Sequence, residues 1–305
     1  MGRKPKISLV IPTYNAARTL DRALASACQQ SWPDREIIVI DGGSGDGTRA
    51  IVEANRLHIA VFVSEPDGGI YDAINKGIAL ATGDLIGVLG ADDTLCDEAL
   101  PRLAAAWRET QPDIICGQAL MVAPDGSQAL RPDEDYGPGA LLSGIPFCHN
   151  AMFATRGAYG AVGNYDLHYR LCADAHWVHR AIRAGLTCRQ VDAPVVRFGL
   201  QGASSTNGEL IMTETYALIL ANFPGLSLTD AQCLFQAIRG WSDGAGVEAV
   251  LRRHCADGEL LLAASLAFAS RARRLNNRQT MLAVVPPAPV WRRVLGGWRR
   301  LARPI

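Results

Sequence analysis

Two adjacent carboxylates, Asp92 and Asp93, are the residues of this sequence whose type and spacing best suit chemistry. They directly follow the apolar run Leu-Ile-Gly-Val-Leu at 85–89, which is typical of a buried strand. Open α/β sheets bind ligands at the carboxyl ends of such strands. Adjacent acids on a turn repel each other unless a cation or hydrogen-bond donors compensate them. The pattern therefore indicates a site for a divalent metal that carries a phosphorylated substrate.

Other interpretations of the acid pair stay open, because it also fits a solvated turn or a helix N-cap, with Asp93 capping a helix over 94–107. A further acid, Asp41, stands at the end of the apolar run 36–40 and before the glycine-rich turn 42–47. Glycine lets backbone approach a ligand closely, so Asp41 is a candidate ligand-binding residue. It can equally order its own turn as an Asx-turn residue.

Alternating strands and helices must position these acids. Short apolar runs predict strands over 7–12, 36–40, 59–64 and 84–89. Helical spacing of apolar residues predicts helices over 16–30, 48–57 and 70–81. Strands that alternate with helices of this length predict an α/β fold of βαβ units with a mostly parallel sheet.

The alternation loosens after Asp93. The pattern predicts further helices over 97–108 and 174–184, and strands or extended segments over 113–116, 147–154 and 187–198. Residues 124–146 are rich in Pro, Gly and Asp, which predicts a long loop or lid. Everything from about residue 209 is expected to be helical, so we place a boundary near Asn207, between 1–207 and 208–305.

Composition and charge limit the possible classes of protein. With 305 residues, 49% of them apolar and 20% charged, the chain can bury a full core. The net charge is zero, but the last 35 residues hold nine arginines and no acid, so the preceding 270 carry −9. A nucleic-acid-binding protein more often spreads basic charge over its folded body, and we therefore expect no nucleic-acid partner.

The eight cysteines include no Cys-x-x-Cys pair and no spacing that suits zinc, which indicates a reducing compartment. The apolar run 7–11 is too short for a signal peptide, and no apolar run reaches the roughly 20 residues that span a bilayer. The expected location is cytoplasmic.

Four separated segments match one known pattern. They are Val-Ile-Pro-Thr-Tyr-Asn at 10–15, Val-Ile-Asp-Gly-Gly-Ser at 39–44 with Asp-Gly-Thr at 46–48, Glu-Pro-Asp-Gly-Gly-Ile-Tyr-Asp-Ala-Ile-Asn-Lys-Gly at 65–77 with Ala-Thr-Gly-Asp at 81–84, and Asp-Asp at 92–93. In order and spacing they resemble family 2 glycosyltransferases with the GT-A fold, over roughly residues 6–200. Residues 68–77 resemble a subgroup common in bacterial exopolysaccharide and surface-glycan assembly.

This resemblance implies a Rossmann-like, mostly parallel sheet flanked by helices in a catalytic domain at 1–207, followed by a helical C-terminal extension at 208–305. It implies a donor that is a nucleotide-diphosphate sugar, expected to be UDP-linked, and Mg²⁺ or Mn²⁺ as the cofactor. In the family the acid at Asp41 hydrogen-bonds the nucleobase. Asp92 is assigned to the nucleotide, and Asp93 to the metal. The residues expected at the donor nucleotide are Pro12, Thr13, Tyr14, Asn15, Asp41, Gly43, Ser44, Asn75, Lys76 and Asp92. A solvated surface lysine is the alternative for Lys76.

The segment 163–177 resembles the acceptor region of the family. Sugar transfer with inversion needs a carboxylate that removes the acceptor hydroxyl proton opposite the leaving group. Asp174 matches the acid that opens a helix there, so it is the expected general base, with a plain N-cap as the alternative. His149 and Asp166 are expected on the acceptor side, although a lone histidine on a strand is more often structural.

The basic tail at 288–305 has tryptophan and leucine at helical spacing with arginines around them. Such a helix can lie on an anionic membrane surface, or it can dock on the catalytic domain. Membrane contact would suit a polyprenyl-linked acceptor, which the subgroup implies, and a peripheral location on the inner face of the plasma membrane. After Gln201-Gly202 the Arg-Trp pair of processive synthases is missing, which predicts addition of a single sugar.

The predicted function is therefore metal-assisted, inverting transfer of one sugar from a nucleotide-diphosphate sugar to a glycan or lipid-linked acceptor, in polysaccharide or cell-surface glycan biosynthesis. A non-catalytic sugar-nucleotide-binding protein of the same fold is one alternative. A dinucleotide-dependent oxidoreductase is another, suggested by the glycines at 43–47. These glycines lack the G-x-G-x-x-G spacing and follow the second strand instead of the first.

Overall fold

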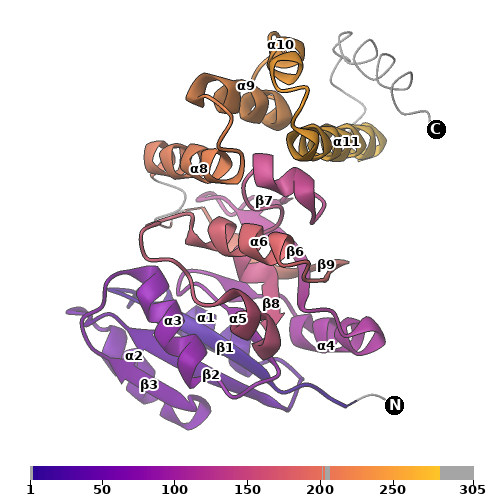
Figure 1. Ribbon diagram of the computed structural model, residues 1–305. Coiled ribbons are helices and arrows are strands. Elements are labelled where there is room, and N and C mark those ends of the chain that lie inside the picture. Colours follow the sequence, from indigo (N-terminus) through magenta and orange to yellow (C-terminus); the bar gives the residue numbers. More distant parts are fainter. Residues whose placement is uncertain (1–2, 201, 203–206, 282–305) are drawn as a thin grey trace.

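A nine-stranded sheet forms the body of the protein, in a computed structural model that describes residues 3–200, 202 and 207–281 (Figure 1). The strand order is β3-β2-β1-β4-β8-β6-β9-β5, and β7 pairs with β6 outside this path. The sheet is curled and mixed, with its parallel strands gathered in the first half of the chain. The predicted α/β class with a mostly parallel sheet is confirmed.

The first half consists of βαβ units. Its elements are β1 (Ile7–Thr13), α1 (Leu20–Cys28), β2 (Arg35–Asp41), α2 (Thr48–Ala54), η1 (Arg56–His58), β3 (Val61–Ser64), α3 (Ile70–Leu80) and β4 (Leu85–Val88). Strands β3, β2, β1 and β4 are parallel neighbours. All four strands and all three helices expected from the apolar patterns are present, with ends shifted by a few residues.

The second half completes the sheet with antiparallel strands. Its elements are β5 (Thr94–Leu95), α4 (Ala99–Thr110), β6 (Ile114–Val122), β7 (Gln128–Leu130), η2 (Pro138–Leu142), η3 (His149–Ala151), β8 (Met152–Thr155), α5 (Arg156–Val162), α6 (Ala173–Arg183) and β9 (Cys188–Gly199). Strand β8 lies between β4 and β6 and is antiparallel to both, whereas β6 and β9 are parallel.

Helices cover both faces of the sheet because its strands alternate. In β1, Ile7, Leu9 and Ile11 pack on one face against α1, α2 and α4, whereas Val10 packs on the other face with α3, α5 and α6. Helix α3 comes unusually close to the sheet at Gly77, where a Cβ would lie 2.3 Å from Val10 Cγ1. The result is three layers whose strand ends remain free for a site.

The helical extension consists of α8 (Gly208–Asn222), α9 (Leu228–Arg239), α10 (Val247–Arg253) and α11 (Gly258–Met281), stacked beyond α6 at the top of Figure 1. It has its own core, which also buries Leu141 and Leu142 of η2. The segment 124–146, predicted to be a long loop or lid, is a loop over most of its length but includes β7, which pairs with β6, and η2. The contacts of η2 with the extension hold this part of the loop in place.

Three local predictions also differ from the structure. The residues after Asp93 form the short strand β5, and the following helix has Glu98 at its N-cap, so Asp93 caps no helix. The strand expected over 147–154 begins only at Met152. Helix α5 has no counterpart in the sequence predictions, since its seven residues include two glycines.

The division at residue 207 stays a prediction, although α8 begins at Gly208. The tail 288–305 lies outside the described residues. Within the part of the chain that is described, no helix has the length and apolarity needed to cross a membrane. All eight cysteines are free thiols.

Candidate functional site

The parallel register brings the predicted acids to one edge of the sheet. Thr13 at the end of β1 pairs with Asp41 at the end of β2, and Asp41 pairs with Ser64 at the end of β3. Strand β4 lies beside β1 in the same direction, and Asp92 and Asp93 follow it. This edge, at the carboxyl ends of β1 to β4, is where open α/β sheets bind ligands.

Asp41 is completely buried and is surrounded by protein donors. Its carboxylate accepts hydrogen bonds from the Ser44 N–H at 3.1 Å, from the Ser64 hydroxyl at 2.6 Å, and from the hydroxyls of Ser44 and Thr13. Burial raises the pKa of Asp41, but these donors outweigh it and lower the pKa below its usual value. Asp41 thus orders its turn, as its alternative interpretation held, and a direct bond to a nucleobase stays a prediction.

The loops above Asp41 are tied together and present an exposed surface. Asn15 has a φ of 48°, its N–H donates to Ser44 Oγ at 2.7 Å, and its side-chain oxygen accepts from Gly45 N–H at 3.0 Å. Pro12 and Thr13 are buried beneath, whereas Tyr14 is 68% exposed and Gly43 is also exposed. Of the predicted donor residues in these loops, Tyr14, Asn15 and the Gly43 backbone are exposed to a ligand.

Asp67 is a further acid at this edge that the sequence pattern did not single out. A Cβ added at Gly42 would lie 2.7 Å from Asp67 Oδ2, so this carboxylate lies directly against the glycine turn. Asp67 follows β3 by three residues, in the same edge of the sheet. Its position after a predicted strand was the available signal.

The two acids of the pair have different environments. Asp93 is only 2% exposed, and it accepts hydrogen bonds from the Gly199 N–H at 2.7 Å and from the Asn150 amide. Burial, with a smaller contribution from the charge of Asp92, raises the pKa of Asp93 to about 7 despite these two donors. Asp92 is exposed. Asp92 is therefore the more accessible ligand, and the assignment of the metal to Asp93 stays a prediction.

The pair nevertheless fits a divalent cation. A Cβ at Gly90 would lie 2.5 Å from an oxygen of Asp93 and 3.0 Å from one of Asp92, so the two carboxylates approach the same point. Burial is the main cause of the raised pKa of Asp93, and the negative charge of Asp92 adds to it. Across residues 3–200, 202 and 207–281, no three His, Cys, Asp or Glu side chains form a metal-holding group. Mg²⁺ commonly takes only one or two carboxylates and completes its shell with water and substrate phosphates.

Asp174 lies in the first turn of α6 and is half-buried. Its Oδ1 accepts from the Tyr71 hydroxyl at 3.0 Å and from the Ala175 N–H at 2.8 Å. Among the described residues, no donor reaches Oδ2. The N-cap of α6 is Cys172, so the alternative of a plain N-cap is wrong for Asp174. One oxygen is held in place and the other is left to accept a proton.

The turn η3 contacts the acid pair and lies near Asp174. Asn150 donates to Asp93, and the preceding residue, His149, has its Nε2 2.8 Å from the Tyr165 hydroxyl. Burial lowers the pKa of His149, and the nearby charge of Asp174 opposes this change. The acceptor role of His149 stays a prediction.

Two predicted residues of α3 have partners within the protein. The side-chain amide of Asn75 makes two hydrogen bonds of 2.9 Å with the backbone of Tyr165: its NH₂ group donates to the carbonyl, and its oxygen accepts from the N–H. Lys76 forms ion pairs with Glu65 at 2.8 Å and Asp72 at 3.4 Å. The structure therefore favours a positioning role for Asn75 and the surface alternative for Lys76. Their mid-helix position on α3 explains this, because only the first turn of a helix reaches the strand ends.

Asp166 accepts from both the backbone N–H and the ring of His168, at 3.0 and 2.8 Å. The N–H of His168, followed by its ring, lowers the pKa of Asp166. Its Oδ2 lies 3.8 Å from His176 on α6, two residues beyond Asp174. Asp166 is thus near the expected base, and its acceptor role stays a prediction.

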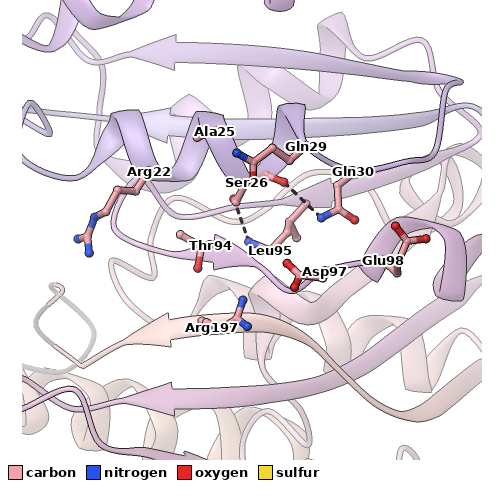
Figure 2. A pocket seen from close by; sticks show the side chains of 10 residues that line it. All are labelled: Arg22, Ala25, Ser26, Gln29, Gln30, Thr94, Leu95, Asp97, Glu98 and Arg197. Carbon is pink, nitrogen blue, oxygen red and sulfur yellow. Dashed lines mark hydrogen bonds between the residues drawn. The ribbon is translucent and has the colours of Figure 1, made fainter.

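A cavity with a volume of about 520 Å³ lies away from this site, between α1 and β5 (Figure 2). Its side chains are mixed in charge, and several are satisfied within the protein: Ser26 accepts from the Leu95 N–H, and the Gln30 amide donates to the Cys96 carbonyl. None of the predicted site residues lines it. The chemistry is concentrated at the strand ends instead.

Comparison with known proteins agrees with this geometry. Residues 8–160 match the family model described as Glycosyl transferase family 2. The chain belongs to glycosyl transferase family 2. The match covers the acid pair and its strands but ends before Asp174. The family assignment of this glycosyltransferase therefore rests on the first half of the chain.

Individual relatives are also glycosyltransferases. The PGL/p-HBAD biosynthesis glycosyltransferase of Mycobacterium tuberculosis is 37% identical over 175 residues, covering 56% of this chain and 67% of the relative. Glycosyltransferase AglE of Haloferax volcanii is 26% identical over 190 residues, covering 59% of this chain and 62% of its own length.

Solved structures share the fold. The crystal structure of S. aureus TarS 1-349 in complex with UDP aligns with a TM-score of 0.60 over 93% of this chain and 94% of that one, at 18% identity. In another TarS structure the matched region is only 44% of that chain. At this identity the likeness shows the GT-A-type fold alone.

Proposed function

We propose that this glycosyltransferase transfers a single sugar from a UDP-sugar to a hydroxyl of a glycan or lipid-linked acceptor, with inversion and with the help of Mg²⁺ or Mn²⁺. The observation that carries the proposal is the arrangement of three acids. Asp92 and Asp93 follow the parallel strands at their carboxyl ends, and Asn150 of η3 contacts Asp93. The neighbouring His149 is near enough to Asp174 for the charge of that acid to act on its pKa, and among the described residues no donor reaches Asp174 Oδ2.

The donor side is supported by its exposed loops. Tyr14 offers an aromatic face and Gly43 an open backbone, and both lie above the buried Asp41 turn. TarS has been crystallised with UDP and with UDP-GlcNAc, which supports a uridine nucleotide at the corresponding edge of this fold. The choice of UDP over other nucleotides is part of the proposal.

Asp92 and Asp93 would hold the cation. A cation held there would offset the negative charge that develops on the departing diphosphate. The exposed Asp92 carboxylate has direct access, and Asp93 adds its charge from behind, where Asn150 and Gly199 orient it.

Asp174 would act as the general base. It lies in the first turn of α6, at the helix end that carries partial positive charge. As the acceptor oxygen attacks the anomeric carbon, its proton moves to Asp174 Oδ2. The bond from that carbon to the diphosphate breaks on the opposite side, and UDP leaves with the electron pair.

A donor screen that measures release of free nucleoside diphosphate, with and without chelator, tests the proposal. We expect release from a UDP-sugar that stops when EDTA is added and returns with Mn²⁺ or Mg²⁺. Asp92→Ala and Asp93→Ala are a matched pair: both should lose metal-dependent donor binding, and the larger loss identifies the main ligand. Binding without turnover of any acceptor would favour a non-catalytic binder, and binding of NAD without UDP would favour an oxidoreductase.

The acceptor and location are the least constrained parts of the proposal. A basic tail at 288–305 would bring the enzyme to the inner face of the membrane, where polyprenyl-linked acceptors of cell-surface glycan biosynthesis are found. Deleting these residues should move the protein from membrane to soluble fractions. An unchanged distribution would contradict the membrane contact while leaving the chemistry intact.

A further inference from the structure

A buried carboxylate of the helical extension contacts the segment that precedes the expected base. Glu214 on α8 is only 8% exposed. Its Oε1 accepts from the Arg170 N–H at 2.8 Å, and its Oε2 accepts from the N–H groups of Leu171 at 2.9 Å and Cys172 at 2.8 Å. Three consecutive backbone donors thus converge on one side chain, directly before α6.

The same segment also contacts helix α3 of the catalytic part. The Tyr71 hydroxyl on α3 lies 3.0 Å from the Leu171 carbonyl and 3.0 Å from Asp174 Oδ1. Cys172 and Ala175 pack against Leu218 of α8. The turn that begins α6 is therefore clamped between α3 and the extension, and Asp174 lies at the end of this clamp.

Only a carboxylate suits these three donors. It is an acceptor on both oxygens, whereas a glutamine would direct an NH₂ group at one or more of the backbone N–H groups. Hydrogen bonds from N–H groups to a charged carboxylate are shorter and stronger than neutral ones. Glu214 therefore determines the path of residues 170–172 more tightly than packing alone would.

We propose that Glu214 is a positioning residue for Asp174, so that the helical extension sets the orientation of the general base. This inference rests on the proposed function, because it assumes that Asp174 removes the acceptor proton. A displacement of about 1 Å at a reacting group can cost about 100-fold in rate. Glu214 touches neither the acid pair nor the loops at Asp41, so its effect should be confined to the chemical step.

The test compares Glu214→Gln with Glu209→Gln, an exposed acid in the first turn of the same helix. We expect kcat of Glu214→Gln to fall by about 10- to 100-fold, with UDP affinity and donor KM within twofold of the wild type. Glu209→Gln should keep the wild-type rate. An unchanged kcat for Glu214→Gln, or an equal loss of donor affinity, would overturn the inference.

A double-variant cycle separates positioning from general stability. If Glu214 acts through Asp174, then Asp174→Asn combined with Glu214→Gln should turn over at the same residual rate as Asp174→Asn alone. Losses that multiply would overturn the inference. A wild-type rate in Asp174→Asn alone would instead overturn the base assignment of the proposed function.

A milder variant keeps the test decisive if Glu214→Gln does not fold, as judged by thermal unfolding and UDP binding. Glu214→Asp keeps the charge and both oxygens but withdraws them by one methylene. We expect a smaller fall in kcat, about 3- to 10-fold, again with unchanged donor KM. A wild-type kcat in a folded Glu214→Asp variant that binds UDP would overturn the inference.

Discussion

The donor edge and the acceptor side of this enzyme are built in different ways. The partners of Asp41 lie 3, 23 and 28 residues away, on adjacent parallel strands and their loops. Asp174 depends on Tyr71, 103 residues away on another layer, and on a segment anchored by Glu214 in the extension. The Asp41 turn of the donor edge is thus self-contained, whereas the acceptor side is assembled from three separate parts of the chain.

This difference agrees with the extent of the family match, which covers 8–160 and therefore the Asp41 turn and the acid pair, but neither Asp174 nor Glu214. If this view is correct, substitutions on the two sides should affect different kinetic parameters, and the following predictions test that separation, from the largest expected effect on activity to the smallest.

The largest effect is expected for Asp174→Asn. General base catalysis typically contributes about 10²- to 10⁴-fold, so kcat should fall by that factor. UDP affinity should stay within twofold, because no donor-edge residue contacts Asp174. Steady-state kinetics and UDP titration measure the two quantities. As a control, Asp192→Asn changes an exposed acid whose partner is Gln118 and should turn over normally. A parallel loss of UDP affinity would break the proposed separation.

Asp41→Asn should act on the donor side. The substituted amide brings an NH₂ group among hydroxyl and N–H donors, which should destabilise the turn by roughly 1–3 kcal/mol. We expect donor KM to rise by about 10-fold, since 1.4 kcal/mol corresponds to a tenfold change, while kcat at saturating donor changes little. Ser64→Ala removes only one of the donors and should give a smaller rise. A normal donor KM for Asp41→Asn would argue that the turn does not shape the donor site.

Tyr71→Phe should have a modest effect on the acceptor side. It removes one hydroxyl that contacts Asp174 and Leu171, and a hydrogen bond typically contributes about 0.5–1.5 kcal/mol. We expect kcat to fall about 3- to 10-fold with unchanged donor KM. Initial-rate measurements at varied donor concentration check this result, and a change in KM alone would contradict it.

The smallest effect on activity is expected for Glu36→Gln, at the opposite edge of the sheet. Burial raises the pKa of Glu36, but bonds from Lys6, Ser8 and Thr82 outweigh it and lower the pKa to about 2. This lowering stabilises the fold above the usual glutamate pKa, and the stabilisation is lost as pH falls from about 4.5 towards 2. Glu36→Gln should therefore cost on the order of 2 kcal/mol at pH 7 and much less near pH 2.

Denaturant unfolding at several pH values measures that difference, with Glu53→Gln, an exposed acid on α2, as the control. Turnover at pH 7 should match the wild type. A pH-independent loss of stability would show that Glu36 contributes through packing instead of charge.

Much of the donor edge could be predicted from the sequence because its signals are local. Apolar runs predicted strands β1 to β4, and the acids that follow them had to meet at one edge once the strands were parallel. The burial of Asp41 could not be predicted, because it depends on Ser64 arriving from the neighbouring strand. The same limit applies to Asp93, whose partners Asn150 and Gly199 are distant in sequence.

The sequence by itself determined the alternation of strands and helices, the family, and the positions of Asp41, Asp92, Asp93 and Asp174 relative to predicted elements. These properties follow from periodicity and spacing over a few residues, where the backbone geometry is the same in every context. Only the tertiary structure decided that η2 supports the extension, that Asn75 binds the backbone of Tyr165, and that Glu214 contacts the start of α6. Such contacts depend on which surfaces the folded layers bring together, and no local pattern records that.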